Sequence, residues 1–237
     1  MREVIVAFGK AGRDLLRADI VWQALWPPVV ALALWTVVGF SVWTEAVLAM
    51  MDLIPDLSWS WWDTASRWAA AFLVFAAFGA LVYFTATLLI ALFALPKMVA
   101  IVAARDYPDL ARRGERPFSL SLANTLAAGA VFMAGWLLLL PLLLVPGAVL
   151  VLPLAWAAWL NQRVFRVDTL AEHATRGELA AIVAREKPRL YLAGLGSALV
   201  AHVPLLNLMV PAFTALVYVH LCLPALRRLR QGEGIAL

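Results

Sequence analysis

The chain has 237 residues, of which 64% are hydrophobic and 14% are charged, with a formal net charge of +4 at pH 7. Soluble globular domains carry about 25% charged residues, so this composition excludes that class and indicates an integral membrane protein. The excess of cations does not predict a nucleic-acid partner, because the lysines and arginines lie beside apolar segments, where lipid headgroups and membrane orientation account for them. The single cysteine, Cys222, excludes an internal disulfide framework and a multi-cysteine metal site.

The first 19 residues alternate apolar and charged side chains at roughly helical spacing, which predicts an amphipathic helix lying in the membrane interface. Residues 20–44 follow without a charge and predict a transmembrane helix, with Pro27 and Pro28 in its early turns. Residues 45–67 form an acidic, tryptophan-rich connector. Residues 68–96 carry no charged side chain and predict a second, longer span, able to tilt or to extend beyond the hydrocarbon core.

Two further apolar stretches are interrupted by prolines. One covers residues 117–162 and the other residues 190–226, and neither contains a lysine, arginine, aspartate or glutamate. Both are too long for one crossing of about 20 residues, and their central prolines predict re-entrant hairpins of two half-membrane helices each. The alternative is a pair of hairpins that cross completely, which leaves about 18 residues for each arm of the second.

The polar segments fix the predicted orientation. Every loop except the connector at 45–67 carries an excess of lysine and arginine, so the positive-inside rule places the connector outside and the other polar segments inside. These segments are residues 97–116, 163–189 and the basic tail 227–237. Within 163–189, Leu179, Ile182 and Val183 predict the apolar face of a short helix, with Glu178 facing water or lipid phosphate, while His173 is expected to be exposed. The prediction is therefore one all-α membrane domain over residues 1–237.

The segment Val203-Pro-Leu-Leu-Asn-Leu-Met-Val-Pro211 is similar to a signature of the CysZ family of bacterial sulfate permeases, within the wider etoposide-induced-protein superfamily. Val145-Pro-Gly147 followed by Pro153, Trp156 and Trp159 resembles the same family, as do the Ala94–Lys97 corner and the arginines ahead of Gly194. The resemblance covers roughly residues 68–225. It implies two long transmembrane helices, two pairs of half-membrane helices, a homo-oligomer, and sulfate uptake across the bacterial inner membrane for cysteine synthesis.

The basic residues before the first span differ from those of the family. Relatives often carry a glycine followed by one or two arginines there, whereas this chain has Ala18 and Asp19 after Arg17. A sulfate would be held by arginines and by helix N-termini, which the broken helices around Pro146, Gly147, Pro204 and Pro211 would supply as hinges. The candidate anion ligands are Arg17, Arg163, Arg166, Arg185, Arg189 and Asn207. Each arginine has the alternative of anchoring to lipid phosphate, and Asn207 that of capping a helix end.

No pattern in the sequence predicts an enzyme, a cofactor or a metal site. His202 and His220 are interpreted as packing residues rather than as a proton relay. The first functional hypothesis is therefore a permease for sulfate or a related small anion in contact with membrane lipids. The alternative hypothesis is a non-transporting membrane scaffold or lipid-interacting protein on the same fold, favoured by the amphipathic first segment.

Overall fold

A computed structural model describes residues 1–55, 57–115, 117–203, 209–232 and 234. Within this part every regular element is helical and no strand occurs, which confirms the all-α class. Five helical stretches are long and apolar enough to cross a membrane: 18–51, 62–106, 118–139, 148–170 and 210–232. The helices are α1 (Arg2–Leu15), α2 (Ala18–Met51), α3 (Trp62–Leu89), α4 (Leu95–Asp106), α5 (Pro117–Leu139), α6 (Ala148–Leu170), α7 (Arg176–Val200) and α9 (Val210–Gly232).

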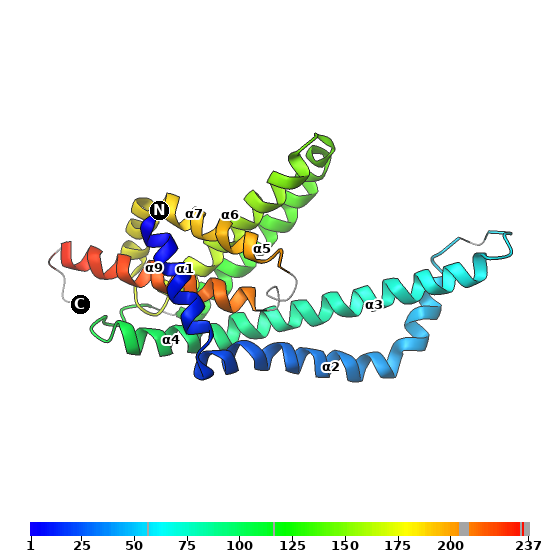
Figure 1. The fold of residues 1–237 in the computed structure, drawn as a ribbon, viewed down its shortest axis with the longest axis horizontal. Helices are drawn as coiled ribbons and strands as arrows, with labels where there is room; N and C mark the ends of the chain where they lie inside the picture. Colours follow the sequence, from blue (N-terminus) through cyan, green and yellow to red (C-terminus); the bar gives the residue numbers. More distant parts are fainter. Residues whose placement is uncertain (56, 116, 204–208, 233, 235–237) are drawn as a thin grey trace.

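Helices α2 and α3 form a long antiparallel hairpin that extends away from the rest of the molecule (Figure 1). The Trp35 indole N–H donates to Thr85 Oγ1 at 2.9 Å, and Trp35 also packs edge-on against Phe78. Helix α2 exceeds the predicted span 20–44 at both ends, so the turn between the two helices covers residues 52–61 rather than 45–67. The uncharged runs of the sequence therefore predicted that these two spans exist, but not where each helix begins and ends.

Helices α3 and α4 are continuous through a π-helical turn, Ile90–Ala94. The Leu95 N–H donates to the Ile90 carbonyl, five residues back, and Pro96 follows without an N–H of its own. A proline ring crowds the preceding turn of a helix, and the wider π turn accommodates it without ending the helix. The span predicted to end at Pro96 thus continues to Asp106, and the first ten residues of the predicted polar segment 97–116 are helical.

Helices α5 and α6 form a second hairpin through the 3-10 turn Leu140–Leu144. The chain reverses at the predicted hinge, where Val145 is extended and Gly147 adopts φ 83°, a conformation that side chains disfavour. Each arm has 23 residues, or about 34 Å of helix, which is enough to cross a bilayer. The arms are longer than the predicted ones, because α6 continues past Gln162 to Leu170. Re-entry or complete crossing of this hairpin stays a prediction.

Helices α7 and α9 form the hairpin predicted at 190–226, but its arms begin at Arg176 and end at Gly232. The Tyr218 hydroxyl donates to the Leu190 carbonyl at 2.8 Å and ties the two arms together. Helix α9 is the most enclosed of the five long apolar stretches and forms the centre of the hydrophobic core. Pro211 is its second residue, whereas the other predicted hinge, Pro204, lies outside the described residues.

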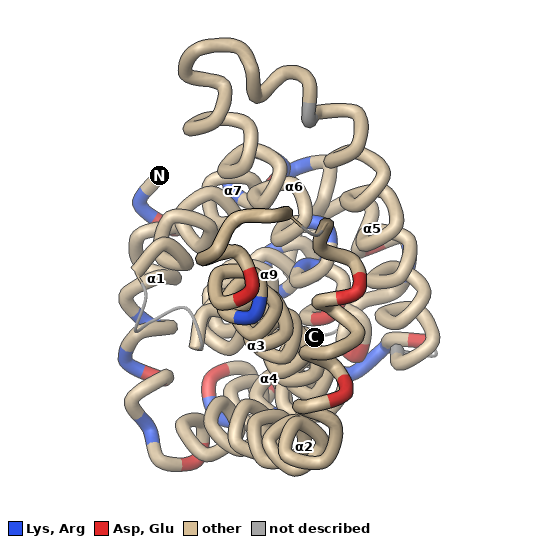
Figure 2. The backbone as a smooth tube through the Cα atoms, turned by 90° about the vertical axis from the view of Figure 1, so that its right-hand side faces the viewer, with Lys and Arg blue, Asp and Glu red and all other residues tan. Residues whose placement is uncertain are grey.

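Helix α1 confirms the predicted amphipathic first segment and packs against α9. Its apolar face buries Val4, Ala7 and Ala11, while Ile5 remains 70% exposed. Figure 2 shows charged residues distributed along α1 and none at the tip of the α5–α6 hairpin. The charged residues of α1 thus lie away from the uncharged tip of the α5–α6 hairpin.

The polar loops are held together by Arg230, whose side chain is fully buried near the end of α9. Its guanidinium donates to Glu178 Oε1 at 2.8 Å and to the carbonyls of Ala111 and His173 at 3.0 and 2.6 Å. Glu178 is the N3 residue of a capping box with Thr175. Two predictions are wrong here, because Glu178 and His173 are buried, and residues 227–232 are part of α9 rather than a polar tail.

Candidate functional site

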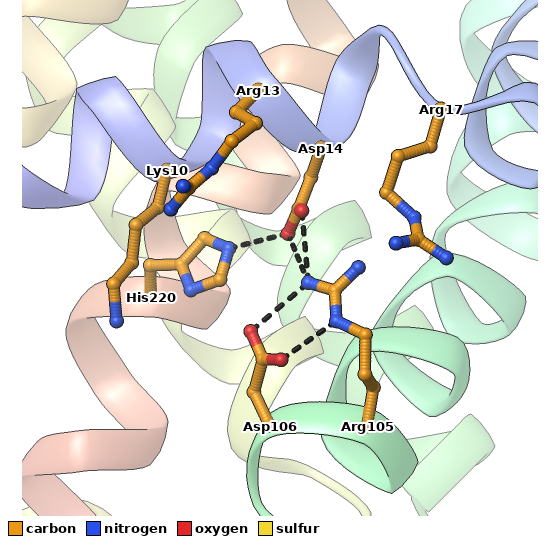
Figure 3. Close-up of a pocket in the computed structure, with 7 residues that line it drawn as sticks. All are labelled: Lys10, Arg13, Asp14, Arg17, Arg105, Asp106 and His220. Atoms are coloured by element: carbon orange, nitrogen blue, oxygen red, sulfur yellow. Dashed lines mark hydrogen bonds and ion pairs between the residues drawn. The ribbon is translucent and has the colours of Figure 1, made fainter.

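Helix α1 directs the charged residues of its second half toward the end of α4 and the middle of α9. Four charged residues follow one another at intervals of three, one and three positions: Lys10, Arg13, Asp14 and Arg17. This spacing groups side chains on one side of a helix. Arg17 comes after the end of α1 and is the N-cap residue of α2, with extended backbone angles. The sharp turn between the two helices therefore brings Arg17 to the same side as the other three (Figure 3).

Asp14 is the centre of this site. Its two carboxylate oxygens each accept a hydrogen bond of 2.8 Å from Arg105 Nη2, while Arg105 Nε donates to Asp106 Oδ1 at 2.6 Å. One guanidinium thus links the last turn of α4 to α1 through two carboxylates. Such charge-assisted bonds are among the strongest in proteins, and Asp14 is itself buried, so this arrangement is rigid.

His220 completes the cluster from α9. Its Nε2 lies 2.7 Å from Asp14 Oδ2, and its Nδ1 is buried without a hydrogen-bond partner among the described residues. His220 is therefore buried between helices, as its interpretation as a packing residue predicted. The structure adds an acidic partner, Asp14, which lies 206 positions away in the sequence. His202 is separate from it: it is exposed in the turn after α7, and its Nδ1 lies 2.8 Å from the Ala198 carbonyl, so the packing position predicted for His202 is wrong.

These side chains line a cavity of about 490 Å³ between α1, α4 and α9 (Figure 3). Four cationic and two carboxylate side chains face it, so its lining carries a formal excess of two positive charges. Lys10 and Arg13 make no hydrogen bond or ion pair with any described residue, and Arg17 makes an exposed pair with Asp19 at 3.1 Å. The arrangement is suited to a small anion, since Lys10 and Arg13 reach the cavity without a neutralising partner among the described residues.

A metal ion is a second chemical interpretation of the same cluster. Asp14, Asp106 and His220 each offer one ligand atom, and these three atoms lie within 4.8 Å of one another. Carboxylates and an imidazole are suitable ligands for a divalent transition metal. Arg105, however, bonds to both carboxylates and supplies the positive charge between them, so the cluster is organised around a guanidinium.

Among the predicted anion ligands that the structure describes, only Arg17 faces this cavity. Arg163 is exposed near the end of α6, about 22 Å along the helix from its N-terminus at Ala148, and so does not flank that helix start. Arg166 is buried and donates to Gln162 at 2.6 Å. The predicted grouping of arginines around the broken helix starts is thus not found at the first hairpin.

The two predicted arginines of α7 lie on another part of the surface. Arg189 makes ion pairs with Glu186 at 2.5 Å and with Glu3 at 3.1 Å, and Arg185 is exposed. Asn207 lies outside the described residues. The sequence patterns did not predict a role in this site for six further residues: Lys10, Arg13, Asp14, Arg105, Asp106 and His220. The spacing along α1 was a usable signal, but those charges were interpreted as the lipid-facing side of an interfacial helix.

The helical spans define a multi-pass helical membrane protein. The chain belongs to the family described as sulfate transporter CysZ/etoposide-induced protein 2.4, whose model matches residues 7–211. The match begins within α1, well before the segment 68–225 in which the sequence motifs lie, and ends at residue 211, so most of α9 lies outside it. Neither the curated proteins nor the solved structures include a match to this chain.

Proposed function

We propose that the protein is a permease for sulfate or a related small oxyanion in the bacterial inner membrane, where it supplies sulfur assimilation and cysteine biosynthesis as a homo-oligomer. Membership of the sulfate transporter family supports the substrate class. The observation that carries the proposal is the basic cavity between α1, α4 and α9. Its position at the charged end of the molecule corresponds to the inner side under the positive-inside rule.

In this proposal Lys10, Arg13 and Arg17 are the anion ligands. Lys10 and Arg13 have no competing ion pair with a described residue, so an incoming anion displaces only water from them. Sulfate is a tetrahedral dianion without a proton to exchange at neutral pH, and it is recognised by several converging charged donors. Arg105 is a positioning residue, because its donors are directed at Asp14 and Asp106.

In this proposal Arg17 binds the anion by giving up its ion pair with Asp19. Its guanidinium donates to both Asp19 oxygens, at 3.2 and 3.1 Å, and both side chains are more than 40% exposed. Exposed ion pairs of this kind contribute about 0–1 kcal/mol, so a bound dianion competes with Asp19 effectively. Asp19 then acts as a local competitor that keeps anion binding weak enough for release, as conduction requires.

The test is uptake of radiolabelled sulfate into proteoliposomes that contain the purified protein. Uptake above that of empty vesicles is expected, with inhibition by related oxyanions and none by a neutral solute. The Lys10→Gln and Arg13→Gln variants should each lower the affinity about tenfold, which corresponds to loss of one charged hydrogen bond. Arg2→Gln is the matched control, since Arg2 is on the same helix but does not line the cavity. Wild-type flux equal to empty vesicles would remove the transport proposal.

A second proposal is a non-transporting scaffold that binds lipid, and the exposed face of α1 favours it. Leu16 is 84% exposed and Ile5 70% exposed, beside the cations Arg2, Arg13 and Arg17. Apolar side chains flanked by cations are typical of helices that lie on anionic lipid. On this proposal, Ile5→Ser with Leu16→Ser reduces association of the helix with anionic vesicles, while sulfate flux is at background in the wild type.

A further inference from the structure

A second cavity lies between α5 and the continuous helix formed by α3 and α4. It has a volume of about 240 Å³, and leucine, alanine, valine, proline and phenylalanine side chains make up most of its wall. Its polar lining comes from Ser121 and Thr125 on α5 and from Asp168 and Glu172 at the end of α6. Phe118 and Leu126 are more than 60% exposed at its rim, so the cavity opens toward the surrounding lipid.

The π-helical turn forms part of this wall. Ala91 and Leu92 belong to the turn, and Leu95, whose N–H donates to Ile90, follows it directly. An i→i+5 turn inserts one residue into the helix and shifts the side chains after it to a different face, and such turns are frequent at functional sites. The displaced face of α4 is the one that stands opposite α5 across the cavity.

Asp168 is a buried carboxylate without a cation. Only 9% of the residue is exposed, and its one hydrogen bond among the described residues is from the Ser121 hydroxyl. No lysine or arginine of the described chain lines the cavity. Glu172, one helical turn further on, has its Oε2 buried without a hydrogen bond, and the Arg112 guanidinium lies 3.9 Å away from it.

A carboxylate in apolar surroundings is costly unless a cation pairs with it, and within a membrane protein such a group marks a functional site by default. We propose that this cavity binds a primary ammonium group carried on an apolar body, with the ammonium at Asp168 and the apolar part between α4 and α5. A hard metal ion would need about six oxygen ligands, whereas most of this wall is hydrocarbon. The ammonium comes either from a free amphiphilic amine or from the headgroup of an ethanolamine phospholipid.

The first arm of the test is direct binding of n-hexylammonium to the purified protein in neutral detergent, measured by calorimetry. Saturable binding is expected for hexylammonium and not for hexanol or hexanoate, which have the same chain without the positive charge. Asp168→Asn should weaken binding by about 10- to 100-fold. Asp52→Asn, which removes an exposed acid outside the cavity, should leave it unchanged. Ala91→Leu fills the cavity but keeps Asp168, so it should also weaken binding. This second variant tests the cavity even if Asp168→Asn fails to fold.

The second arm is native mass spectrometry of protein extracted from membranes that contain phosphatidylethanolamine and phosphatidylglycerol. Selective retention of the ethanolamine lipid, lost in Asp168→Asn, supports the proposal with a lipid ligand. Hexylammonium binding without lipid selectivity supports it with a free amine. Equal affinity of Asp168→Asn and wild type for hexylammonium overturns it, as does the absence of binding in both arms. Neither arm depends on sulfate flux, so the result is independent of the transport proposal.

Discussion

Arg105 at the end of α4 donates to both carboxylate oxygens of Asp14 on α1, at 2.8 Å each, across 91 positions of the chain. His220 of α9 lies 2.7 Å from one of the same oxygens. Asp14 is therefore the point at which α1, α4 and α9 are joined. Helix α1 also packs on α9 through Val4, Ala7 and Ala11, and Asp14 adds the polar link that orients Arg105 at the basic cavity.

Replacement of Asp14 should release α1. In Asp14→Asn, Arg105 and His220 lose a buried acceptor, and breaking a buried ion pair from one side costs about 3 kcal/mol. The expected result is a lower unfolding midpoint in detergent, together with faster tryptic cleavage at Lys10 and Arg13. The matched control is Asp19→Asn, whose pair with Arg17 is exposed and contributes less than about 1 kcal/mol. Equal stability of the two variants would contradict the central role of Asp14.

Removal of Arg105 should convert the cluster into a metal site. In Arg105→Ala, Asp14, Asp106 and His220 remain with three ligand atoms within 4.8 Å and no cation between the carboxylates. Two carboxylate oxygens and an imidazole nitrogen match the ligands of Zn²⁺. A zinc-dependent rise in the melting temperature is expected for Arg105→Ala, and not for the wild type. Adding His220→Gln should abolish the effect, and its persistence would locate the zinc elsewhere.

Acid should destabilise the loop network through His173. Burial, assisted by Arg112 and Arg230, lowers the pKa of His173 to about 4 from its ordinary value of 6.5. The folded state thus favours the neutral imidazole, and this contribution is complete above pH 6.5 and is lost as the pH falls toward 4. The shift corresponds to about 3 kcal/mol in total. Unfolding measured from pH 7 to 4.5 should show this loss, and His173→Asn should have a flatter profile.

Glu178 acts in the same direction at lower pH. Burial alone would raise the pKa of this carboxyl group, but the hydrogen bonds from Arg230 and from the Thr175 N–H outweigh burial and lower it. Its contribution is therefore present above the ordinary value of 4.5 and is lost as the pH falls below it. Above pH 4.5, the difference between wild type and His173→Asn therefore does not include the contribution of Glu178. An identical slope for wild type and His173→Asn in that window would contradict the assignment.

Gly114 should not tolerate a side chain. Its N–H donates to the Glu172 carbonyl at 3.0 Å, and a Cβ atom there would overlap the Ala171 oxygen and lie 2.8 Å from the Glu172 carbonyl carbon. Both neighbours are backbone atoms of the turn after α6, so Gly114→Ala should destabilise the protein by about 3 kcal/mol. Gly12→Ala in α1 is the control, because no atom lies within 4 Å of its Cβ position and a helix favours alanine. Similar melting temperatures for the two variants would argue against the close approach.

The sequence was sufficient for the class and for the order of the elements, because charge and hydropathy determine which segments enter a membrane. It was insufficient for helix ends. Helix α6 continues eight residues past Gln162, although Arg163, Arg166 and Asp168 made that stretch appear to be a polar loop. Arg166 and Asp168 are stabilised there by partners on neighbouring turns and helices, Gln162 and Ser121, which only the fold brings together.

The site was less predictable than the fold for a related reason. Asp14, Arg105 and His220 are distributed over 206 positions, and no local pattern connects them. Arg17 was found because it stands before the first span, where a resemblance directed attention. Lys10, Arg13 and Asp14 of α1 lie on the same side as Arg17, but a charged face is also what an interfacial helix presents to lipid. Long-range packing of α1 on α9 distinguishes the two, and a single sequence does not contain that information.

The depth of the α5–α6 hairpin is the remaining prediction. Each 23-residue arm spans about 34 Å, more than the roughly 30 Å of a bilayer core, so its tip should reach the outer face. In a Cys222→Ala background, Leu144→Cys is expected to react with an impermeant maleimide added outside, as is Ser58→Cys in the α2–α3 turn. Glu115→Cys, at the base of α5, should react only after the inner face is exposed. Reaction of Leu144→Cys from neither face would mean that the tip ends within the hydrocarbon, and the half-membrane arrangement would then hold despite the length of the arms.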